Sequence, residues 1–309
     1  MIISISRRTD IPAFFSEWFY NRIEDGYFMV RNPMNIHQVS KVTVTPQNAE
    51  CLVFWTKNPS FSFIENLPKL DEKGFNYYFQ FTITSYAQDI EKSVSRKTEI
   101  IEKFQKLSNQ IGKEKVIWRY DPIILNKKYN FDYHIKYFDY IAEKLSAYTE
   151  KVIISFVDCY SKIKTRLQEN EITELSQEEM RKLGIALKQI AEKHNLKIES
   201  CSETIDFDDI GIPHGHCIDG ELINRICQRN FIFKKDKTQR KECGCVTSVD
   251  IGSYNTCRHN CAYCYATWNG IIPNSIDNSS PLLGSVLSNE DKVTERKIPV
   301  LKEYNPELF

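Results

Sequence analysis

Three cysteines near the end of the chain have a spacing that suits an iron–sulfur cluster. Cys257, Cys261 and Cys264 follow a C-x3-C-x2-C pattern. Their thiolates can bind three irons of one cluster, whereas a four-iron cluster held wholly by protein takes four thiolates. One iron would then stay open to another ligand. The spacing therefore predicts a [4Fe–4S] cluster with one open coordination site at this loop.

Zinc is the main alternative for the same thiols. Zinc prefers four ligands, commonly two pairs of cysteines, and Cys243 and Cys245 stand upstream to complete such a set. Disulfides rarely persist in the cytosol, and the sequence shows neither a signal peptide nor a run of about 20 apolar residues. We therefore expect a cytoplasmic protein without a membrane partner, whose ten cysteines serve metal or redox chemistry. Incidental thiols remain the third interpretation.

Four of the seven cysteines that precede the loop could form a second metal site. They are Cys201, Cys217, Cys243 and Cys245. Four thiolates would suit an auxiliary iron–sulfur cluster, or a zinc ion with His214 or His216 as a substitute ligand. Because their spacing is dispersed, buried or loop thiols without a metal remain the alternative.

Length and charge narrow the classes of function. The 309 residues are enough for one large α/β barrel or for two ordinary domains. Lys plus Arg and Asp plus Glu number 41 each, so the chain has no net charge that would attract nucleic acid or an anionic membrane. The sequence thus favours a globular protein that recognises its ligand locally.

Seven short apolar runs alternate with helical segments. The runs are 2–6, 51–55, 77–82, 116–120, 152–156, 196–200 and 246–251, and the helical segments are 12–24, 88–109, 131–147 and 176–194. Nearly continuous apolar runs are typical of parallel strands buried on both faces. The alternation therefore predicts an α/β fold, a TIM-like β/α barrel that is complete or partial.

Polar side chains directly follow most of these strands. The candidates are Ser6, Arg7, Arg8 and Asp10 after the first strand, Lys57 after the second, and Arg119 and Asp121 at the fourth. The carboxyl ends of barrel strands form the active face, so we expect one shared site, with solvated loops as the alternative. We predict that Lys57, Arg119 and Asp121 are catalytic and, because cations outnumber carboxylates, that the substrate is polar or anionic.

Several sequence boxes resemble the DUF1848 family of bacterial and archaeal proteins. They are Ser6-Arg-Arg-Thr-Asp-Ile-Pro12, Phe54-Trp-Thr-Lys-Asn-Pro59, Trp118-Arg-Tyr-Asp-Pro122 and Cys243-Gly-Cys245 with the three-cysteine loop. The resemblance covers essentially the whole chain. The loop, with Tyr263 before its third cysteine, also resembles the cluster loop of radical S-adenosylmethionine (SAM) enzymes. In outline, the family is similar to the spore photoproduct lyase branch of these enzymes.

This resemblance implies an enzyme that cleaves SAM reductively and removes hydrogen from a substrate through a 5′-deoxyadenosyl radical. Ser6, Arg7, Arg8 and Asp10 would hold SAM, with an arginine fork on its carboxylate, and Tyr263 would lie near the adenine. A helix cap is the alternative role of Asp10. The implied partners are a flavodoxin or ferredoxin and a small-molecule, nucleotide or peptide substrate. The competing function is a non-catalytic zinc- or iron–sulfur-binding module that recognises a partner.

The loop stands at an unusual place for radical SAM enzymes, in which it usually follows the first strand. A barrel brings its first and last strands side by side, and circular permutation is tolerated where termini lie close together. We therefore predict a permuted barrel over residues 1–270, in which run 246–251 pairs in parallel with run 2–6. Residues 271–309 are expected to pack on the barrel as an arm or lid. Cys159 or Tyr120 is suggested as a hydrogen donor.

Overall fold

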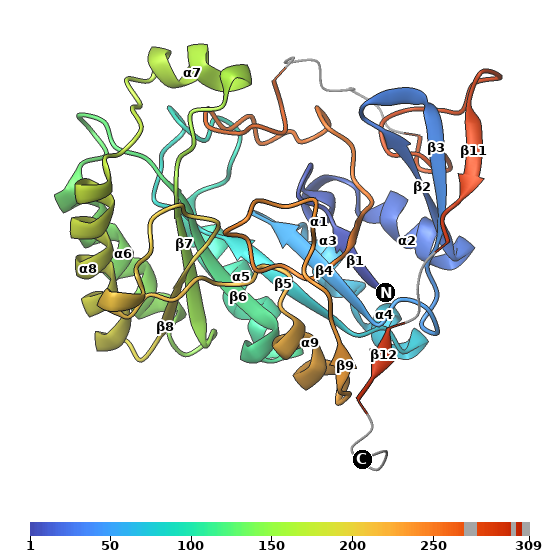
Figure 1. The fold of residues 1–309 in the computed structure, drawn as a ribbon, viewed down its shortest axis with the longest axis horizontal. Helices are drawn as coiled ribbons and strands as arrows, with labels where there is room; N and C mark the ends of the chain where they lie inside the picture. The colour runs from blue at the N-terminus through green and yellow to red at the C-terminus, as the bar shows by residue number, and fades with distance from the viewer. Residues whose placement is uncertain (269–276, 298–300, 305–309) are drawn as a thin grey trace.

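A curved sheet of parallel strands forms the centre of the protein. The computed structural model describes residues 1–268, 277–297 and 301–304. The seven strands lie in the order β10 (Val249–Asp250), β1 (Ile2–Ile5), β4 (Cys51–Thr56), β5 (Tyr77–Thr82), β6 (Val116–Ile123), β7 (Lys151–Phe156) and β8 (Lys197–Ser200). Every neighbouring pair is parallel. This mixed α/β arrangement is consistent with a partial β/α barrel (Figure 1).

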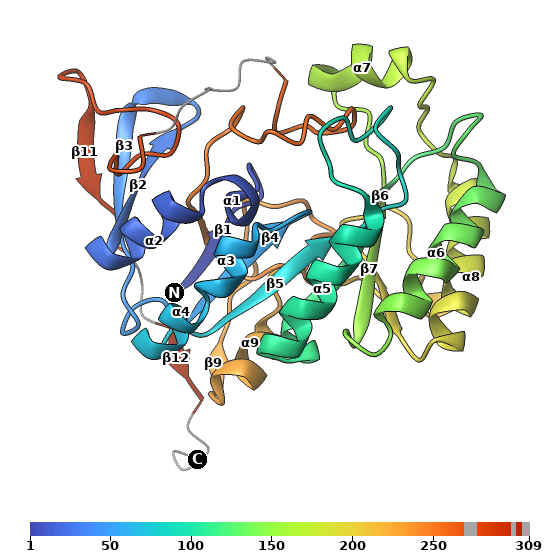
Figure 2. The same ribbon diagram turned by 180° about the vertical axis from the view of Figure 1, so that it is seen from behind.

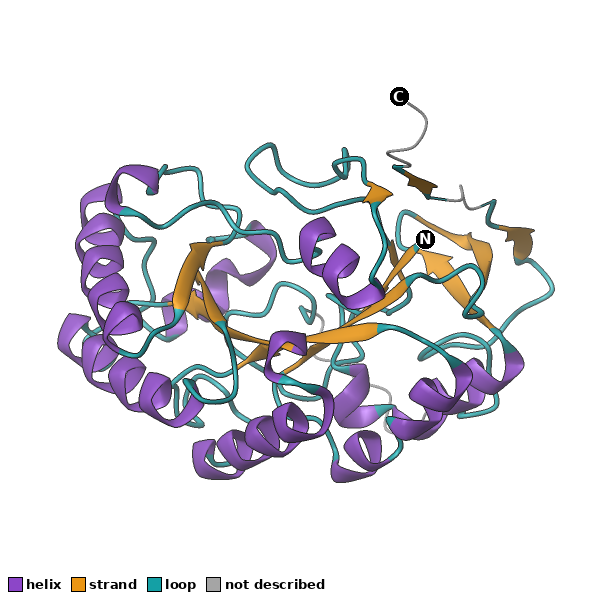
Figure 3. Ribbon diagram, turned by 90° about the horizontal axis from the view of Figure 1, so that it is seen from below, coloured by secondary structure: helices purple, strands orange, loops and turns teal. Residues whose placement is uncertain are grey.

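Helices cover the convex face of the sheet (Figures 2 and 3). The described helices are α1 (Ile11–Phe14), α2 (Ser16–Asp25), α3 (Phe61–Glu65), α4 (Pro68–Lys73), α5 (Lys97–Ile111), α6 (Phe131–Leu145), α7 (Lys164–Glu169), α8 (Gln177–Lys193) and α9 (Gly220–Cys227), with 3-10 turns η1 (Lys113–Lys115), η2 (Ser161–Ile163) and η3 (Asp208–Ile210). Phe81 packs against Phe104 of α5, and Trp118 stacks on Phe138 of α6. The main apolar core therefore lies between the sheet and these helices.

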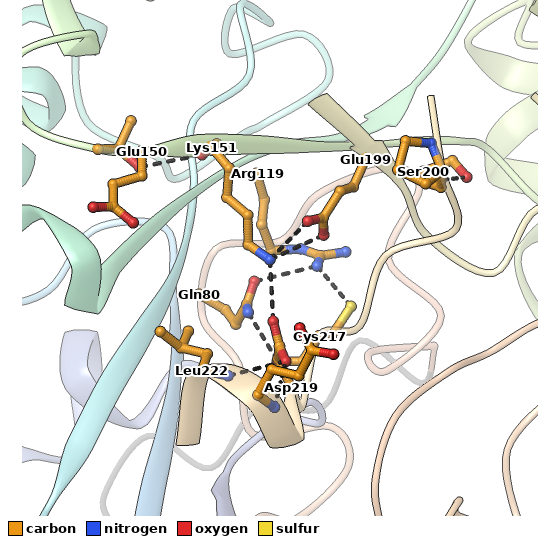
Figure 4. Close-up of polar contacts among 12 residues, drawn as sticks. Gln80, Arg119, Glu150, Lys151, Glu199, Ser200, Cys217, Asp219 and Leu222 are labelled. Carbon is orange, nitrogen blue, oxygen red and sulfur yellow. Dashed lines mark hydrogen bonds and ion pairs between the residues drawn. The ribbon is translucent and has the colours of Figure 1, made fainter. Parts of the chain in front are cut away.

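Helix α9 closes part of the concave face. Its Leu222 and Ile223 pack in a second apolar cluster with strand residues such as Val53. Lys151 on β7 pairs with Glu199 at 2.9 Å and with Asp219, the N-cap of α9, at 3.2 Å (Figure 4). This ion triad anchors the start of α9 to two strands, so the segment before α9 has a fixed position inside the curve.

The edge strand β10 occupies the predicted place beside β1. Ile3 pairs with Val249 and Ser4 with Asp250 in parallel register, so the predicted pairing of the two runs is confirmed. The Asp250 carboxylate accepts hydrogen bonds from the Ser4 hydroxyl at 3.0 Å and from the Arg7 amide at 2.8 Å. β1 and β10, the first and last strands of this sheet in chain order, are thus joined by side chains as well as by their backbones.

Two helix predictions need correction. The helix predicted over 88–109 begins only at Lys97, because Ile90 and Ala262 form a backbone hydrogen bond of 2.8 Å and hold the preceding segment as turns against the cysteine loop. The helix predicted over 12–24 is interrupted at Phe15 and ends at Gly26, which has the left-handed conformation. By contrast, α6 and α8 agree closely with prediction, and a capping box formed by Ser176 and Glu179 opens α8.

Five strands were not predicted. Strands β2 (Tyr27–Asn32), β3 (Asn35–Thr43) and β11 (Lys292–Glu295) form one small sheet, and β9 (Phe231–Ile232) pairs with β12 (Lys302–Glu303). Their short or exposed segments lack the buried apolar runs of the central strands. They therefore escape a prediction that rests on apolar continuity.

The described part of the predicted arm packs beside the barrel. Trp18 on α2 donates to the Ser280 carbonyl at 2.8 Å, and Arg31 on β2 pairs with Asp291 at 2.6 Å. The predicted boundary at residue 270 lies outside the described residues. Across the described ranges, no helix is long and apolar enough to cross a membrane.

Candidate functional site

One cavity of about 350 Å³ brings together the cysteines and the polar strand-end residues predicted for the site. They are Ser6, Arg7, Arg8, Asp10, Lys57, Arg119, Asp121, Cys201, Cys217, Cys243, Cys245, Cys257, Cys261, Tyr263 and Cys264. The cavity lies where β1, β4, β6, β7 and β8 end, as expected for the active face of a parallel sheet. Its volume falls within the roughly 300–1,000 Å³ of small-molecule sites.

The three-cysteine loop is fixed to the barrel by its backbone. Cys261 forms an isolated bridge with Glu91, and the Cys264 carbonyl accepts from the Arg166 guanidinium of α7 at 2.6 Å. Burial raises the pKa of Cys257 to about 12, and the neighbouring Cys264 thiol contributes to this rise as the second-largest cause. Over the described ranges, no three or more His, Cys, Asp or Glu side chains already converge as they would around one metal ion. The structure therefore places the three thiols in one cavity, and their metal role stays a prediction.

A buried carboxylate faces the lysine that was predicted to be catalytic. Glu91 is fully buried and pairs with Lys57 at 2.8 Å and with Lys97. Thr84 and Tyr263 also donate their hydroxyls to this carboxylate. Burial alone would raise the pKa of Glu91, but the two ammonium groups outweigh it and hold this pKa below its ordinary value. Lys57 therefore lies at the cavity wall as one half of an ion pair.

Arg119 and Asp121 form the second charged network. The Arg119 Nε donates to Asp121 at 2.9 Å, and its Nη1 donates to the Cys217 sulfur at 2.8 Å and to Gln80 at 3.3 Å (Figure 4). Ser155 donates to the other oxygen of Asp121. Burial would raise the pKa of Asp121, but Arg119 outweighs it and lowers this pKa. Arg119 is thus held by three neighbours, which points to positioning; the catalytic role of the pair stays a prediction.

The residues after β1 surround an arginine with an unused donor. Asp250 accepts from the Ser6 hydroxyl at 2.5 Å and fixes the turn that follows. Arg8 donates to the Gly252 carbonyl at 3.3 Å. The Arg7 guanidinium lies 5.1 Å from the centre of the Trp55 ring, and its Nη2 is buried without a hydrogen-bond partner among the described residues. Because a buried donor without a partner is costly, Arg7 is the candidate to bind an anion.

Asp10 caps a helix, which was the alternative to its predicted role in binding SAM. It caps α1 by accepting from the Ala13 amide at 3.0 Å. Its other oxygen accepts from the Lys57 amide at 2.7 Å and contacts His259 Nε2 at 2.8 Å. The cap interpretation is confirmed, and Asp10 also connects β4 to the cysteine loop. Binding of the SAM ammonium by Asp10 stays a prediction.

The four upstream cysteines lie together on another wall of the cavity. The sulfurs of Cys201 and Cys217 are 3.0 Å apart. Cys245 lies near both Cys217 and Cys243, close enough for each thiol to shift the pKa of its neighbour. Cys245 is the largest cause of the lowered pKa of Cys243, about 6. Thiols that are dispersed in the sequence thus form a continuous chain in space.

Further carboxylates lie beside cations at the cavity, so fewer of these cations are free than the sequence suggested. Besides Glu91 at Lys57, Asp158 pairs with Arg240 at 2.7 Å on the rim. Glu203 also lines the cavity, and burial raises its pKa to about 8. Asp158 and Glu203 follow strands, so the strand-end pattern of the sequence already covers them. Glu91 had no usable signal, because its segment was assigned to a helix.

The suggested hydrogen donors do not line the cavity. Cys159 is exposed. Tyr120 is fully buried on the convex side, where its hydroxyl contacts Ser85 at 2.9 Å and His134 at 2.8 Å. Proximity in sequence was a poor guide here, because neighbouring residues of a strand point to opposite faces. Neither residue is retained as a donor.

Comparison with known proteins identifies the family but no activity. No curated protein matches the chain. Among solved structures, a candidate alpha-L-fucosidase from Bacteroides thetaiotaomicron is similar with 11% identity and a TM-score of 0.25, over 58% of this chain and 83% of that one. A likeness at that level carries no argument about function. The family model of DUF1848, a domain of unknown function, matches residues 2–266, so the chain belongs to the DUF1848 family.

Proposed function

We propose that this protein is a radical SAM enzyme whose [4Fe–4S] cluster is held by Cys257, Cys261 and Cys264. The observation that carries the proposal is the shared cavity, in which these thiols and the buried, unpartnered Nη2 of Arg7 lie at the carboxyl edge of a parallel sheet. The donor set fits the cofactors, because three soft thiolates suit iron and a guanidinium suits a carboxylate. When bound, the cluster and SAM would supply a 5′-deoxyadenosyl radical that removes a hydrogen atom from the substrate.

The chain's own residues would bind and orient SAM. Arg7 would hold the carboxylate through its unused donor, while Ser6 and Asp250 keep the turn that carries Arg7 in place. Tyr263 is fixed by its hydrogen bond to Glu91, so its ring has a set orientation at the cavity wall, near the proposed adenine position. The networks around Glu91 and Arg119 would keep this wall rigid and exclude water.

The unusual chain order supports a circular permutation of the radical SAM barrel. The strand that precedes the cysteine loop lies beside β1 although it comes last in the sheet's sequence order. Residues 6–10, which follow β1, therefore reach the cavity that the loop lines. In the proposed arrangement β10 takes the place of the usual first strand, and β1 that of the second.

The substrate would be a polar molecule bound between Lys57, Arg119 and Asp121. An anionic substrate gains less support than the sequence suggested, because Lys57 and Arg119 already face carboxylates. A flavodoxin or ferredoxin would supply the electron. The alternative function, a metal-binding module without catalysis, is favoured by one observation: four additional thiols lie in contact on the cavity wall.

The test is product formation by the anaerobically reconstituted full chain. With dithionite and SAM it should release 5′-deoxyadenosine and methionine, slowly even without substrate, and the variant C257A/C261A/C264A should release none. The matched control is Cys159→Ser, which removes an exposed thiol outside the cavity. A reconstituted wild-type protein that binds SAM but forms no 5′-deoxyadenosine with any reductant refutes the proposal in favour of the module.

SAM binding provides a second measurement. Loss of a charge-assisted hydrogen bond costs about 1.5–3 kcal/mol, so Arg7→Ala should weaken SAM binding roughly 10- to 150-fold. Arg240→Ala is the matched control, since this cavity-lining arginine already pairs with Asp158 on the rim. If calorimetry gives the Arg7→Ala variant and the wild type equal affinities for SAM, Arg7 does not bind SAM.

A further inference from the structure

We propose that Cys201, Cys217, Cys243 and Cys245 form a second metal centre, a four-thiolate site for a thiophilic metal. The site is separate from the C-x3-C-x2-C loop, although both sets line the same cavity. The inference does not depend on radical chemistry, because it concerns a different set of ligands. It decides between the two interpretations that the sequence left open for these four side chains, a metal site or free thiols.

The contacts between the thiols are the first support. The Cys201 and Cys217 sulfurs lie 3.0 Å apart, and Cys245 lies near enough to Cys217 and Cys243 to affect both thiols electrostatically. Sulfurs around one tetrahedral zinc ion, at a Zn–S distance of about 2.3 Å, lie roughly 3.8 Å from one another. The thiols form a chain and do not yet surround one point. Metal binding therefore requires their side chains to turn.

The charges around the thiols are the second support. Four thiolates with a divalent ion, or with a cluster, leave a net negative group that must be neutralised when it is buried. The Arg119 Nη1 donates to the Cys217 sulfur at 2.8 Å. Arg7 also lines this cavity within electrostatic range of Cys245 and Cys217, while its Nη2, unpartnered among the described residues, stays available for the SAM carboxylate. Two guanidinium groups thus face the thiols, which neutral thiols would not require.

The backbone around the thiols is the third support. Cys217 directly precedes Ile218, whose amide donates to the Cys245 sulfur at 3.3 Å, as amides do to metal-bound thiolates. Gly244 separates the last two cysteines, and a Cβ atom there would lie 1.9 Å from the His216 ring. The glycine therefore lets a histidine lie against the backbone between the two thiols. The segments that carry the thiols are anchored by the Lys151 triad and by β8.

The experiment measures metal content in the full-length loop variant C257A/C261A/C264A, purified anaerobically and offered zinc, or iron with sulfide. We expect a stoichiometric metal to remain, about one zinc or about four irons per chain. X-ray absorption should show sulfur ligands at about 2.3 Å. Zinc and iron–sulfur outcomes both support the centre and identify its metal; the close thiol contact favours a single ion.

Removal of the thiols should abolish this metal. Adding C201S and C243S to the loop variant should lower the content below about 0.1 metal per chain, whereas adding the exposed control Cys159→Ser should leave it unchanged. If the added pair prevents folding, the absorption spectrum of the loop variant decides the question without it. A folded loop variant that takes up neither metal in stoichiometric amount, or a metal bound mainly through nitrogen and oxygen, overturns the proposal.

Discussion

Replacement of Glu91 by glutamine should destabilise the protein strongly, because it leaves two lysines without their carboxylate. Glu91 has no exposed surface and lies 2.8 Å from the Lys57 ammonium, with Lys97 as its second partner. Breaking a buried ion pair from one side typically costs about 3–5 kcal/mol, since the remaining charge stays buried. Lys97 retains some solvent exposure, so we expect the lower half of this range, about 3–4 kcal/mol.

The pH dependence follows from the lowered pKa of Glu91. This pKa lies below its ordinary value of 4.5, mainly because two ammonium groups outweigh the effect of burial. The carboxylate's contribution to stability is therefore complete above about pH 4.5 and is lost as pH falls towards the folded pKa. The stability difference between wild type and E91Q should be constant from pH 6 to pH 8 and should shrink below about pH 4.5.

The assay is urea unfolding followed by fluorescence and circular dichroism. The matched control is Glu102→Gln, the same change at an exposed position of α5, which should alter stability by less than about 0.5 kcal/mol. A double variant E91Q/K97M should regain part of the loss, because it removes one of the two stranded cations. An E91Q protein within about 1 kcal/mol of wild type at pH 7, or a difference that grows in acid, would refute the reasoning.

Two further predictions concern the cavity wall. Burial raises the pKa of Glu203 to about 8, so wild type should lose stability as the pH rises from about 4.5 to 8. Glu203→Gln, which carries no titrating carboxyl, should therefore be the more stable protein, by a margin that grows across this window to a few kcal/mol. Urea unfolding at pH 5, 7 and 8 measures this margin. Gly252→Ala should cost about 1–3 kcal/mol, because its Cβ would lie 2.1 Å from the Ser6 hydroxyl oxygen. Gly184→Ala, where the backbone is not left-handed and the nearest atom to the added Cβ lies 3.6 Å away, is the control in thermal melts.

The strands and the location of the site followed from the sequence because both depend on local patterns. A strand buried on two faces, such as β4, has an unbroken apolar run, here from Cys51 to Trp55, that few helices share. Residues at the carboxyl ends of parallel strands share one edge whatever the strand order, so Arg7, Lys57 and Arg119 could be grouped before their distances were known. The three-cysteine loop was recognised in the same way, because the spacing of its cysteines is a local pattern of the sequence.

The ion partners did not follow from the sequence, because they come from distant segments. Glu91 reaches Lys57 only because a segment with helical periodicity is held as turns by the cysteine loop. Cys217 meets Arg119 through a segment that the Lys151 triad anchors. Each partner depends on tertiary contacts that no local pattern encodes, and a charge count along the chain therefore overstated the free cations in the cavity.

The position of the cysteine loop at the end of the chain is consistent with a site beside the first strand. A direct chain connection between β10 and β1 would fix the register of the two strands. In this protein side-chain hydrogen bonds fix that register instead. Asp250 accepts from Ser4 and Ser6 side chains and from the Arg7 amide, so one carboxylate ties the last strand to the first and to the turn after it. The closest approach of Gly252 to Ser6 leaves no room for a side chain at this junction. The register of β10 and β1 is therefore fixed without a direct chain connection between the two strands.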